Sequence, residues 1–423
     1  MAERLVLSRL CAWLTGPLLL LVLAVGGLFL AVLENAPLVE RSENISPVSI
    51  DQARRLFHTN DPRRLQPGEA RHTAIPATLI DEGVNALASR GLKARGAFVL
   101  SGETAEIRLT RRIPLIPGAP FLNLKASIRP GSGEPKIDAA SIGQTRIPPA
   151  VVETMLNIAA DARGYGPEWQ LARKAIHELA FDPARRQVIV GYTWEPSLLD
   201  HARAIAFSPD DLVRIRSAQE SLAGLLDHYA PGRRIPFTGV LQSMLEVNGS
   251  DQRENRRAAL LVLGVYLAEK NIASLIPEAR GWPPLRPVVM MLAGRNDSAQ
   301  HFAVSAMLAA WAGEPVADAI GLYKELADAR HGSGFSFADL AADRAGTRFG
   351  ELINRRDQRL NTLLNREIEE RDLVPPLGDL PESISAVAFQ RHFGSTSSPA
   401  YRQLTAEIER RLDGMPLYQP QQR

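Results

Sequence analysis

Cysteine is almost absent from this chain of 423 residues, and the one copy, Cys11, lies in an apolar stretch near the N-terminus. A single thiol forms no intrachain disulfide, and the rest of the chain offers neither a cysteine nucleophile nor a cysteine zinc ligand. The part of the chain that follows the apolar stretch must therefore be stabilised by a hydrophobic core.

The sequence also lacks a large excess of either positive or negative side chains. The 49 Lys and Arg side chains nearly balance the 47 Asp and Glu side chains, which leaves a formal charge of +2. No field over the whole chain favours nucleic acid, so we expect no nucleic-acid partner. The sequence also has no P-loop, dinucleotide-binding glycine motif, nucleophile elbow or pair of His four residues apart.

A long apolar run occurs once. Residues 10–33 contain no charge over 24 positions, and about 20 apolar residues suffice to cross a bilayer. A cleaved signal peptide is the alternative, but its apolar core is shorter, roughly 7 to 15 residues. Arg4 and Arg9 precede the run, so the positive-inside rule places the N-terminus in the cytoplasm. We expect a single-pass protein of a bacterial inner membrane with its bulk in the periplasm.

The chain then divides into an α+β part and a helical part. We expect a cytoplasmic tip and transmembrane anchor at 1–34, an α+β extracytoplasmic domain at 48–196, and an all-α domain at 198–416. In the α+β part, apolar and polar residues alternate over 105–110, 121–129 and 187–194, which predicts strands. Helices are expected at 49–57, 78–90 and 151–162. This order predicts a curved antiparallel sheet that wraps a helix or encloses an apolar groove.

Three short motifs in this part carry a resemblance to a known family. They are Phe121-Leu122-Asn123-Leu124, Ile142-Gly143 and Ile147-Pro148. Together with the preceding anchor and the following helix, they resemble the YpmS-like membrane-anchored envelope proteins. The resemblance covers about a third of the chain and implies an extracytoplasmic module that binds lipid or an envelope polymer.

Strand patterns end near residue 198, and apolar residues then recur at helical spacing. Ser208, followed by Pro209 and two acidic residues, is a typical helix start. Apolar runs such as 258–268 are too short to cross a membrane and predict buried helices. We expect helices at 212–229, 237–247, 250–270, 286–293, 298–312, 315–330, 336–370 and 398–412.

Polar side chains stand at helical spacing inside this apolar half, between residues 295 and 350. Asp297 and His301 are four residues apart and share one helix face. A carboxylate in that position can orient an imidazole behind a metal or in a catalytic base. In the alternative interpretation, Asp297 complements the helix dipole and His301 finds a partner in the core.

Glu325 and Asp328 are three residues apart, and two acids on one helix face repel each other unless they are exposed, paired or bound to a cation. With His301 they offer the nitrogen and carboxylate ligands that suit zinc, manganese or iron. We predict a hypothetical catalytic cluster of His301, Asp297, Glu325, Asp328 and Asp343. The corresponding divalent-metal site consists of His301, Glu325, Asp328, Asp339 and Asp343.

Ser336 and Asp339 have the spacing of a capping box, in which the serine accepts from a backbone amide and the acid reaches back. Asp343 lies one turn later. Its neighbours Ala341, Ala345 and Gly346 predict close helix packing, so its carboxylate needs a partner.

The same stretch contains an ordered set of short motifs: Asp297 to His301 with Phe302 and Ser305, Lys324-Glu325 with Asp328, Gly334-Phe335-Ser336, and Asp339 to Gly346. This set resembles that of the VanZ-like proteins and the related YfiM-type predicted lipoproteins. The resemblance implies a place in the bacterial envelope and a link to glycopeptide tolerance, without a defined reaction. VanZ-like helices are long membrane spans, whereas the corresponding helices here are expected to be soluble.

Three functions follow as hypotheses. The leading one is a membrane-anchored periplasmic protein that binds or organises lipid or cell-wall precursor. The first alternative is a metal-dependent hydrolase of an envelope substrate, in which a divalent metal activates water. The second alternative is a structural partner of an envelope complex, whose polar cluster fixes the register of its helices.

Overall fold

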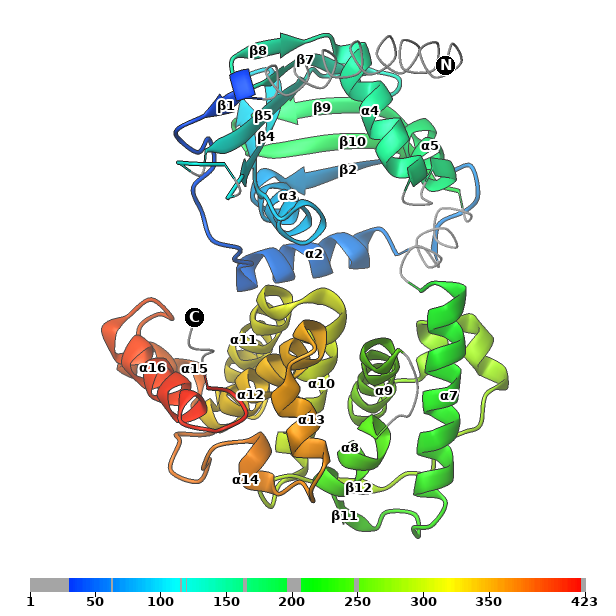
Figure 1. Cartoon of the computed structure of the whole chain (residues 1–423), viewed down its shortest axis with the longest axis vertical. Helices are drawn as coiled ribbons and strands as arrows, with labels where there is room; N and C mark the ends of the chain where they lie inside the picture. Colours follow the sequence, from blue (N-terminus) through cyan, green and yellow to red (C-terminus); the bar gives the residue numbers. More distant parts are fainter. Residues whose placement is uncertain are drawn as a thin grey trace, which may run out of the picture. The chain divides into compact units, whose positions relative to one another are not determined.

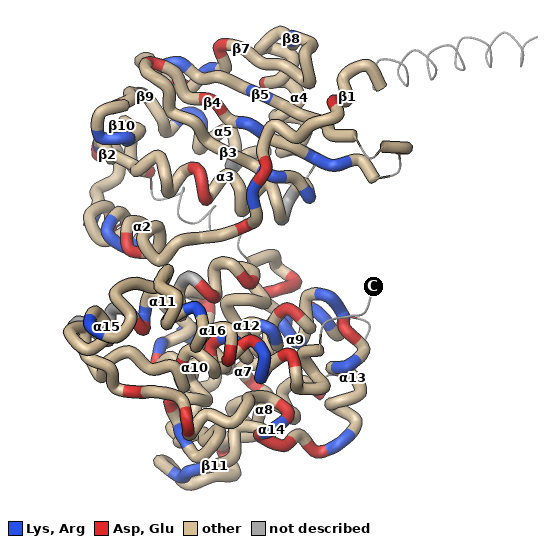
Figure 2. The backbone as a smooth tube through the Cα atoms, turned by 90° about the vertical axis from the view of Figure 1, so that its left-hand side faces the viewer, with Lys and Arg blue, Asp and Glu red and all other residues tan. Residues whose placement is uncertain are grey.

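The computed structural model describes residues 30–61, 64–114, 116–118, 120–162, 166–195, 207–246 and 251–419. The chain forms two compact units, shown in Figure 1. Unit 1 comprises residues 1–44 and 52–200, and unit 2 comprises residues 45–51 and 201–423. Lys and Arg are interspersed with Asp and Glu along both units, so neither sign of charge gathers in one region (Figure 2).

Unit 1 contains two antiparallel sheets (Figure 1). The first has the order β3 (Arg95–Ser101), β4 (Thr104–Arg112), β5 (Phe121–Ile128), β7 (Ile137–Ile142) and β8 (Thr145–Ile147), with β1 (Leu33–Glu34) paired to the start of β5. The second has the order β2 (Ala70–Pro76), β10 (Gln187–Thr193), β9 (Ile176–Asp182) and β6 (Gly131–Ser132). The helices of unit 1 are α3 (Ala77–Leu92), α4 (Pro149–Ala162) and α5 (Gly166–Ala175). The residues of α2 (Pro47–Thr59) are divided between the units: those up to 51 belong to unit 2 and the rest to unit 1.

The first sheet has one apolar and one polar face, as the alternation in the sequence predicts. In the pairing of β4 with β5, Ile107 lies opposite Ala126 and Leu109 opposite Leu124, while Arg108 lies opposite Lys125. Directly paired residues point to the same side, so the apolar side chains collect on one face. The α+β class with antiparallel sheets is confirmed.

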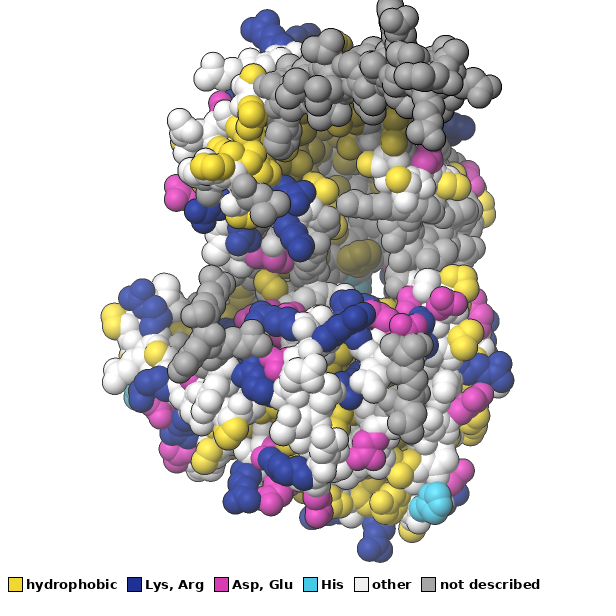
Figure 3. Space-filling view, in the orientation of Figure 1, with side chains coloured by type: hydrophobic (Ala, Val, Ile, Leu, Met, Phe, Trp, Pro, Cys, Tyr) yellow, Lys and Arg dark blue, Asp and Glu magenta, His cyan; other side chains and the backbone are white. Residues whose placement is uncertain are grey.

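Unit 1 buries its apolar face incompletely. Among its described residues, every buried hydrophobic side chain is an alanine or a valine. The larger apolar residues of β4 and β5 are only half-buried. Figure 3 shows hydrophobic side chains gathered in a hollowed part of this unit.

Unit 2 is a helical domain with a dense core. Its helices are α7 (Pro209–Leu226), α8 (Phe237–Leu245), α9 (Gln252–Leu267), α10 (Asn296–Ala312), α11 (Glu314–His331), α12 (Phe337–Arg355), α13 (Gln358–Leu364), α14 (Glu370–Leu373), α15 (Ala386–His392) and α16 (Pro399–Asp413). Two short 3₁₀ turns span Ile272–Ser274 and Pro277–Gly281. The core includes three buried phenylalanines, in which the ring of Phe302 contacts the rings of both Phe237 and Phe349.

The prediction of a helix at 286–293 is wrong. Val289–Met291 forms strand β12, which pairs in parallel with β11 (Arg234–Pro236). Pro287 removes a backbone donor, and β-branched residues follow it, so the segment favours an extended chain. Ala293 and Gly294 then take positive φ, which turns the chain into α10.

The expected helix at 336–370 is too long. Helix α12 ends at Arg355, because the next residue, Arg356, takes a left-handed conformation with φ of 54°. Asp357 then caps α13 by accepting a hydrogen bond from the Arg359 amide at 2.9 Å. Left-handed residues at helix ends are usually Gly or Asn, so an arginine gives no signal in the sequence.

Most of the predicted membrane span, residues 10–29, lies outside the described residues. Within the part that is described, no helix is long and apolar enough to cross a membrane. The span therefore stays a prediction from the sequence.

The contact between α10 and α12 is unusually close. A Cβ atom at Gly346 would overlap the carbonyl oxygen of Phe302, and one at Gly350 would overlap that of Ala306. Glycine at these two positions, one helical turn apart, lets the backbones touch. This contact brings the polar residues of α10 and α12 together.

We expect Gly346→Ala to lower the free energy of unfolding of unit 2 by about 1–3 kcal/mol, because the added methyl group forces the helices apart. Gly224→Ala on α7 is the matched control, since a Cβ there meets nothing within 4 Å. It should stabilise the protein by up to about 1 kcal/mol through helix propensity. Urea unfolding measures the free energy of unfolding of both variants. Equal changes in the two variants would contradict the close contact between α10 and α12.

Candidate functional site

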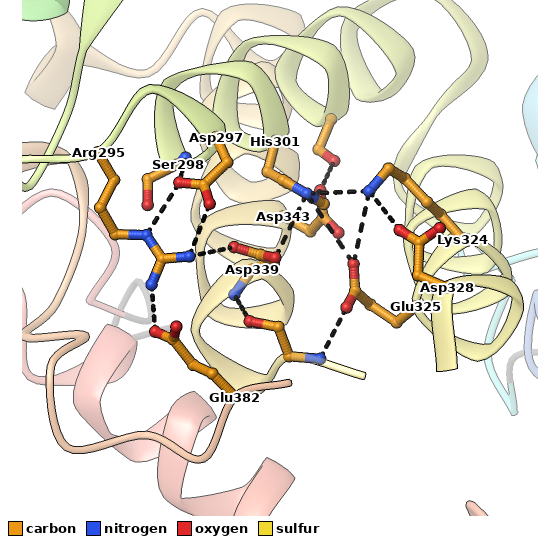
Figure 4. A network of polar contacts seen from close by, with 12 residues as sticks. Arg295, Asp297, Ser298, His301, Lys324, Glu325, Asp328, Asp339, Asp343 and Glu382 are labelled. Carbon is orange, nitrogen blue, oxygen red and sulfur yellow. Dashed lines mark hydrogen bonds and ion pairs between the residues drawn. The ribbon is translucent and has the colours of Figure 1, made fainter. Parts of the chain in front are cut away.

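The predicted polar residues lie on three helices of unit 2 and meet at His301 (Figure 4). His301 is on α10, Glu325 on α11, and Asp339 and Asp343 on α12. Spacings of three, four or seven residues place each set on one helix face. Packing of α10 against α11 and α12 then closes the cluster.

The imidazole of His301 is enclosed by carboxylates. Its Nδ1 lies 3.1 Å from Oδ1 of Asp343, and its Nε2 lies 3.7 Å from Asp339 and 3.9 Å from Glu325. The side chains of His301, Glu325 and Asp343 are 5%, 1% and 7% exposed. Groups this well buried interact strongly because water screens them little.

Asp343 holds the imidazole and is itself held by a hydroxyl. Ser305, one turn after His301, donates a hydrogen bond of 2.7 Å to Oδ1. The other oxygen, Oδ2, is buried and has no hydrogen-bond partner among the described residues. A Cβ at Gly321 on α11 would come within 2.8 Å of that oxygen, so this glycine makes room for the carboxylate.

Glu325 also has one bonded and one unbonded oxygen. Its Oε2 accepts a hydrogen bond from the Ser336 amide at 2.9 Å. Its Oε1 is buried and accepts no hydrogen bond from a described residue, and the ammonium of Lys324 lies 3.9 Å from it. Burial, with the charge of Asp343, raises the pKa of Glu325 to about 7. A buried polar atom without a hydrogen bond is costly, so a donor or a cation in direct contact with Oε1 of Glu325 and Oδ2 of Asp343 would be favourable.

Lys324 borders the cluster on the side of Asp328. Its Nζ lies 2.9 Å from Asp328 and 3.2 Å from Nε2 of His301, and the side chain is half-exposed. Asp328 stands four residues after Lys324 and forms a helix-surface ion pair with it. Asp328 therefore belongs to the rim of the cluster.

Arg295 borders the opposite side, as Figure 4 shows. It donates to both oxygens of Asp297, at 2.9 and 2.7 Å, and also contacts Asp339 and Glu382. The hydrogen bonds from Arg295 hold the pKa of Asp297 below its ordinary value. Arg295 thus links the start of α10 to the first turn of α12.

Two opposing effects set the protonation of His301. Burial lowers the pKa of its imidazole, and the ammonium of Lys324 lowers it further. Asp343 and Asp339 outweigh both and raise the pKa of His301 to about 9. Burial raises the pKa of Asp339 as well. The raised pKa values of His301, Glu325 and Asp339 show that the cluster favours additional positive charge.

A count of formal charges supports this. The labelled residues of Figure 4 include six carboxylates, from Asp297, Glu325, Asp328, Asp339, Asp343 and Glu382, against two permanent cations, Arg295 and Lys324. With every carboxyl group ionised, the difference is −4 with a neutral His301 and −3 with a charged one. Protonation of Glu325, whose pKa is about 7, reduces the excess by one charge. A bound cation would offset the charge that remains.

The structure corrects several expectations about partners. Asp297 does not orient His301, because its oxygens bond to Arg295 and to the Ser298 amide. Ser336 does cap α12 by accepting from the Asp339 amide at 3.0 Å. The reciprocal half of the capping box is replaced, because the Ser336 amide donates to Glu325.

Four contributing residues were missing from the predicted cluster: Ser305, Lys324, Arg295 and Glu382. Ser305 follows His301 by four residues, so helical spacing could have identified it. Arg295 precedes the helix, and Glu382 lies 87 residues further along the chain in a loop. No local pattern connects those two positions.

Three donor groups are close enough to share a metal ion. One ligand atom each from His301, Glu325 and Asp343 lies within 4.8 Å of the other two. Ligand atoms on one ion are about 3 to 4 Å apart, so small side-chain movements would complete the set. Asp339 lies next to this set, at 3.7 Å from the imidazole, and is more exposed than its members.

Comparison with known proteins gave no relatives, since neither a family model, nor a curated protein, nor a solved structure matches the chain. The resemblances to YpmS-like and VanZ-like proteins therefore stay predictions. The function must therefore be inferred from the geometry of the cluster.

In metal-free buffer, we expect Asp343→Ala to lower the free energy of unfolding by about 3–5 kcal/mol, because it leaves His301 buried without its partner. Asp328→Ala removes an exposed ion pair and should cost at most about 1 kcal/mol. Chemical denaturation of the two variants tests this difference. If both variants cost the same, Asp343 is not the buried partner of His301.

Proposed function

We propose that unit 2 binds a divalent metal ion at His301, Glu325 and Asp343 and is a metal-dependent hydrolase. One observation carries the proposal: two buried carboxylate oxygens beside an imidazole, Oε1 of Glu325 and Oδ2 of Asp343, accept no hydrogen bond from any described residue. Nitrogen and carboxylate ligands suit zinc, manganese or iron.

The surrounding residues have separate roles in this proposal. A divalent metal held by these three residues would lower the pKa of water and so supply a nucleophile at neutral pH. Asp339, at the edge of the ligand set, would accept the proton of the attacking water and donate it to the leaving group. The water oxygen would bond to the carbon of an ester or amide, or to the phosphorus of a phosphate ester, as the bond to the leaving atom breaks. Ser305 and Arg295 position Asp343 and Asp339.

The apolar run supports a proposed location for this activity. Residues 10–33 are long enough to cross a bilayer, and Arg4 and Arg9 favour a cytoplasmic N-terminus. We therefore place both units in the periplasm, held at the inner membrane by one span. The substrate class that fits this location is an envelope lipid or a cell-wall precursor.

A second function, lipid binding by unit 1, is favoured by its incompletely covered apolar face. α3 packs against β3, and α4 packs over Ala126 and Ala140 through Val152. Between these helices, Ile107 and Leu124 are half-buried on the apolar face. Acyl chains fit such a surface, since apolar area removed from water is favourable in proportion to its size. In this proposal the apolar face of unit 1 binds an acyl chain.

Metal binding can be measured on the full chain in detergent with Zn²⁺ or Mn²⁺ alone. We expect one ion per chain by elemental analysis, and a thermal stabilisation of about 2.7 kcal/mol when the metal is at 100 times its dissociation constant. His301→Ala should weaken binding more than 100-fold, beyond the roughly 10–100-fold effect of losing an outer partner. Asp328→Asn should leave binding unchanged.

Lys324 distinguishes metal binding from a purely structural network. If a metal binds beside Nε2, Lys324→Met should keep or increase the affinity, because it removes a competing positive charge. If wild type binds no ion and Lys324→Met destabilises the protein, Lys324 is itself the cation of the cluster. That outcome would overturn the metal proposal and favour a structural partner of an envelope complex.

Lipid binding can be tested with a phospholipid that carries a photoreactive acyl chain. We expect cross-links from the full chain to residues of β4 and β5, reduced several-fold by Leu124→Gln. Lys125→Gln is the matched control, because Lys125 is the next residue of β5 and lies on its polar face. Cross-links confined to residues 10–33 would contradict lipid binding by unit 1.

A further inference from the structure

Helix α4 presents an apolar stripe that no described residue covers. Val151, Met155 and Ile158 are 45%, 54% and 61% exposed, at spacings of four and three residues. These spacings place them on one helix face. Leu156, beside this stripe, is 43% exposed. Exposed apolar side chains gathered in this way mark an interaction surface.

The opposite face of α4 is anchored in unit 1. Val152 is buried against Ala126 and Ala140 of the first sheet. Helix α5 holds α4 from the side, since the indole of Trp169 donates a 2.8 Å hydrogen bond to Asn157. The exposed stripe therefore has a fixed orientation.

The apolar run of residues 10–33 ends close to the start of α4. Strand β1, formed by its last residue and Glu34, pairs with β5. Gly143, at the turn between β7 and β8, lies so close to Val32 that a Cβ atom would overlap the Val32 carbonyl oxygen. Helix α4 begins at Pro149, six residues after that glycine. Figure 1 shows β1, β7, β8 and α4 at one end of unit 1.

We propose that the exposed stripe of α4 lies on the lipid bilayer in which residues 10–33 are anchored. This inference rests on the membrane anchor of the proposed function. A chain that leaves the bilayer at Leu33 brings the Gly143 turn, and with it the start of α4, to the membrane surface. The 14 residues of α4 extend about 20 Å, so several turns can reach the lipid.

The composition of α4 defines the kind of contact. Glu153 and Asp161 are its only charged residues, and it contains no Lys or Arg. The helix itself therefore offers no basic residue that would attract anionic lipids. The contact is apolar, and it should be independent of salt and of anionic lipid content. It also places the apolar face of the first sheet within reach of lipid from the bilayer.

Nitroxide probes on the full chain test this directly. Cys11→Ser removes the only native thiol. Met155→Cys or Ile158→Cys then carries the probe, with the protein in phosphatidylcholine nanodiscs. We expect high accessibility to oxygen and low accessibility to a water-soluble nickel chelate. Leu87→Cys on α3 is the control, because Leu87 is equally apolar and 76% exposed and should be open to nickel.

The alternatives give different results. Nickel accessibility at 155 and 158 equal to that at 87 overturns the docking while leaving the anchor intact. Low accessibility to both reagents means that protein covers the stripe, either residues 10–33 or a second copy, and also overturns it. Failure of the full chain to enter nanodiscs overturns the anchor itself.

A double substitution separates docking from folding. Met155→Glu with Ile158→Glu changes exposed side chains, so the circular dichroism spectrum and melting temperature should stay the same. A probe at Val151→Cys should move from lipid to water in this double variant. If that probe stays in lipid, the stripe does not make the contact.

Discussion

The structure of unit 2 depends on the close contact between α10 and α12. Gly346 and Gly350 let the two backbones touch, and only at that separation can Asp343 on one helix reach His301 on the other. A buried imidazole and carboxylate are each unfavourable alone, but together they compensate one another. The other oxygen of Asp343, Oδ2, lies against Gly321 of α11 and accepts no hydrogen bond from a described residue. Helix packing therefore places one oxygen of Asp343 against His301 and leaves the other without a hydrogen bond.

The two units bury their apolar side chains to different extents. Unit 2 interlocks Phe237, Phe302 and Phe349 in a core that fixes the polar cluster. Unit 1 buries mainly alanine and valine, and it leaves larger apolar side chains half-covered on its sheets. A dense core suits a site whose ligand atoms must be held in place, whereas an open apolar face suits a flexible acyl chain. The proposed metal centre and lipid surface match these two kinds of packing.

Local sequence patterns predicted much of the secondary structure. Alternation identified β4, β5 and β10, and the Ser208 capping signal identified the start of α7. The predictions failed where conformation is not set locally. Strand β12 exists because β11, about 55 positions earlier in the chain, supplies its hydrogen bonds. Arg356 ends α12 in a left-handed conformation that arginine does not favour by itself.

For the polar cluster, the sequence by itself determined which residues could share a helix face. Spacing alone grouped Asp297 with His301 and Glu325 with Asp328, because helical geometry is local. Only the tertiary structure decided which groups meet. In the structure His301 contacts Asp343, whereas Asp297 binds Arg295 and Asp328 binds Lys324 at the rim of the cluster. The reason is that contacts between helices depend on packing rather than on distance along the chain.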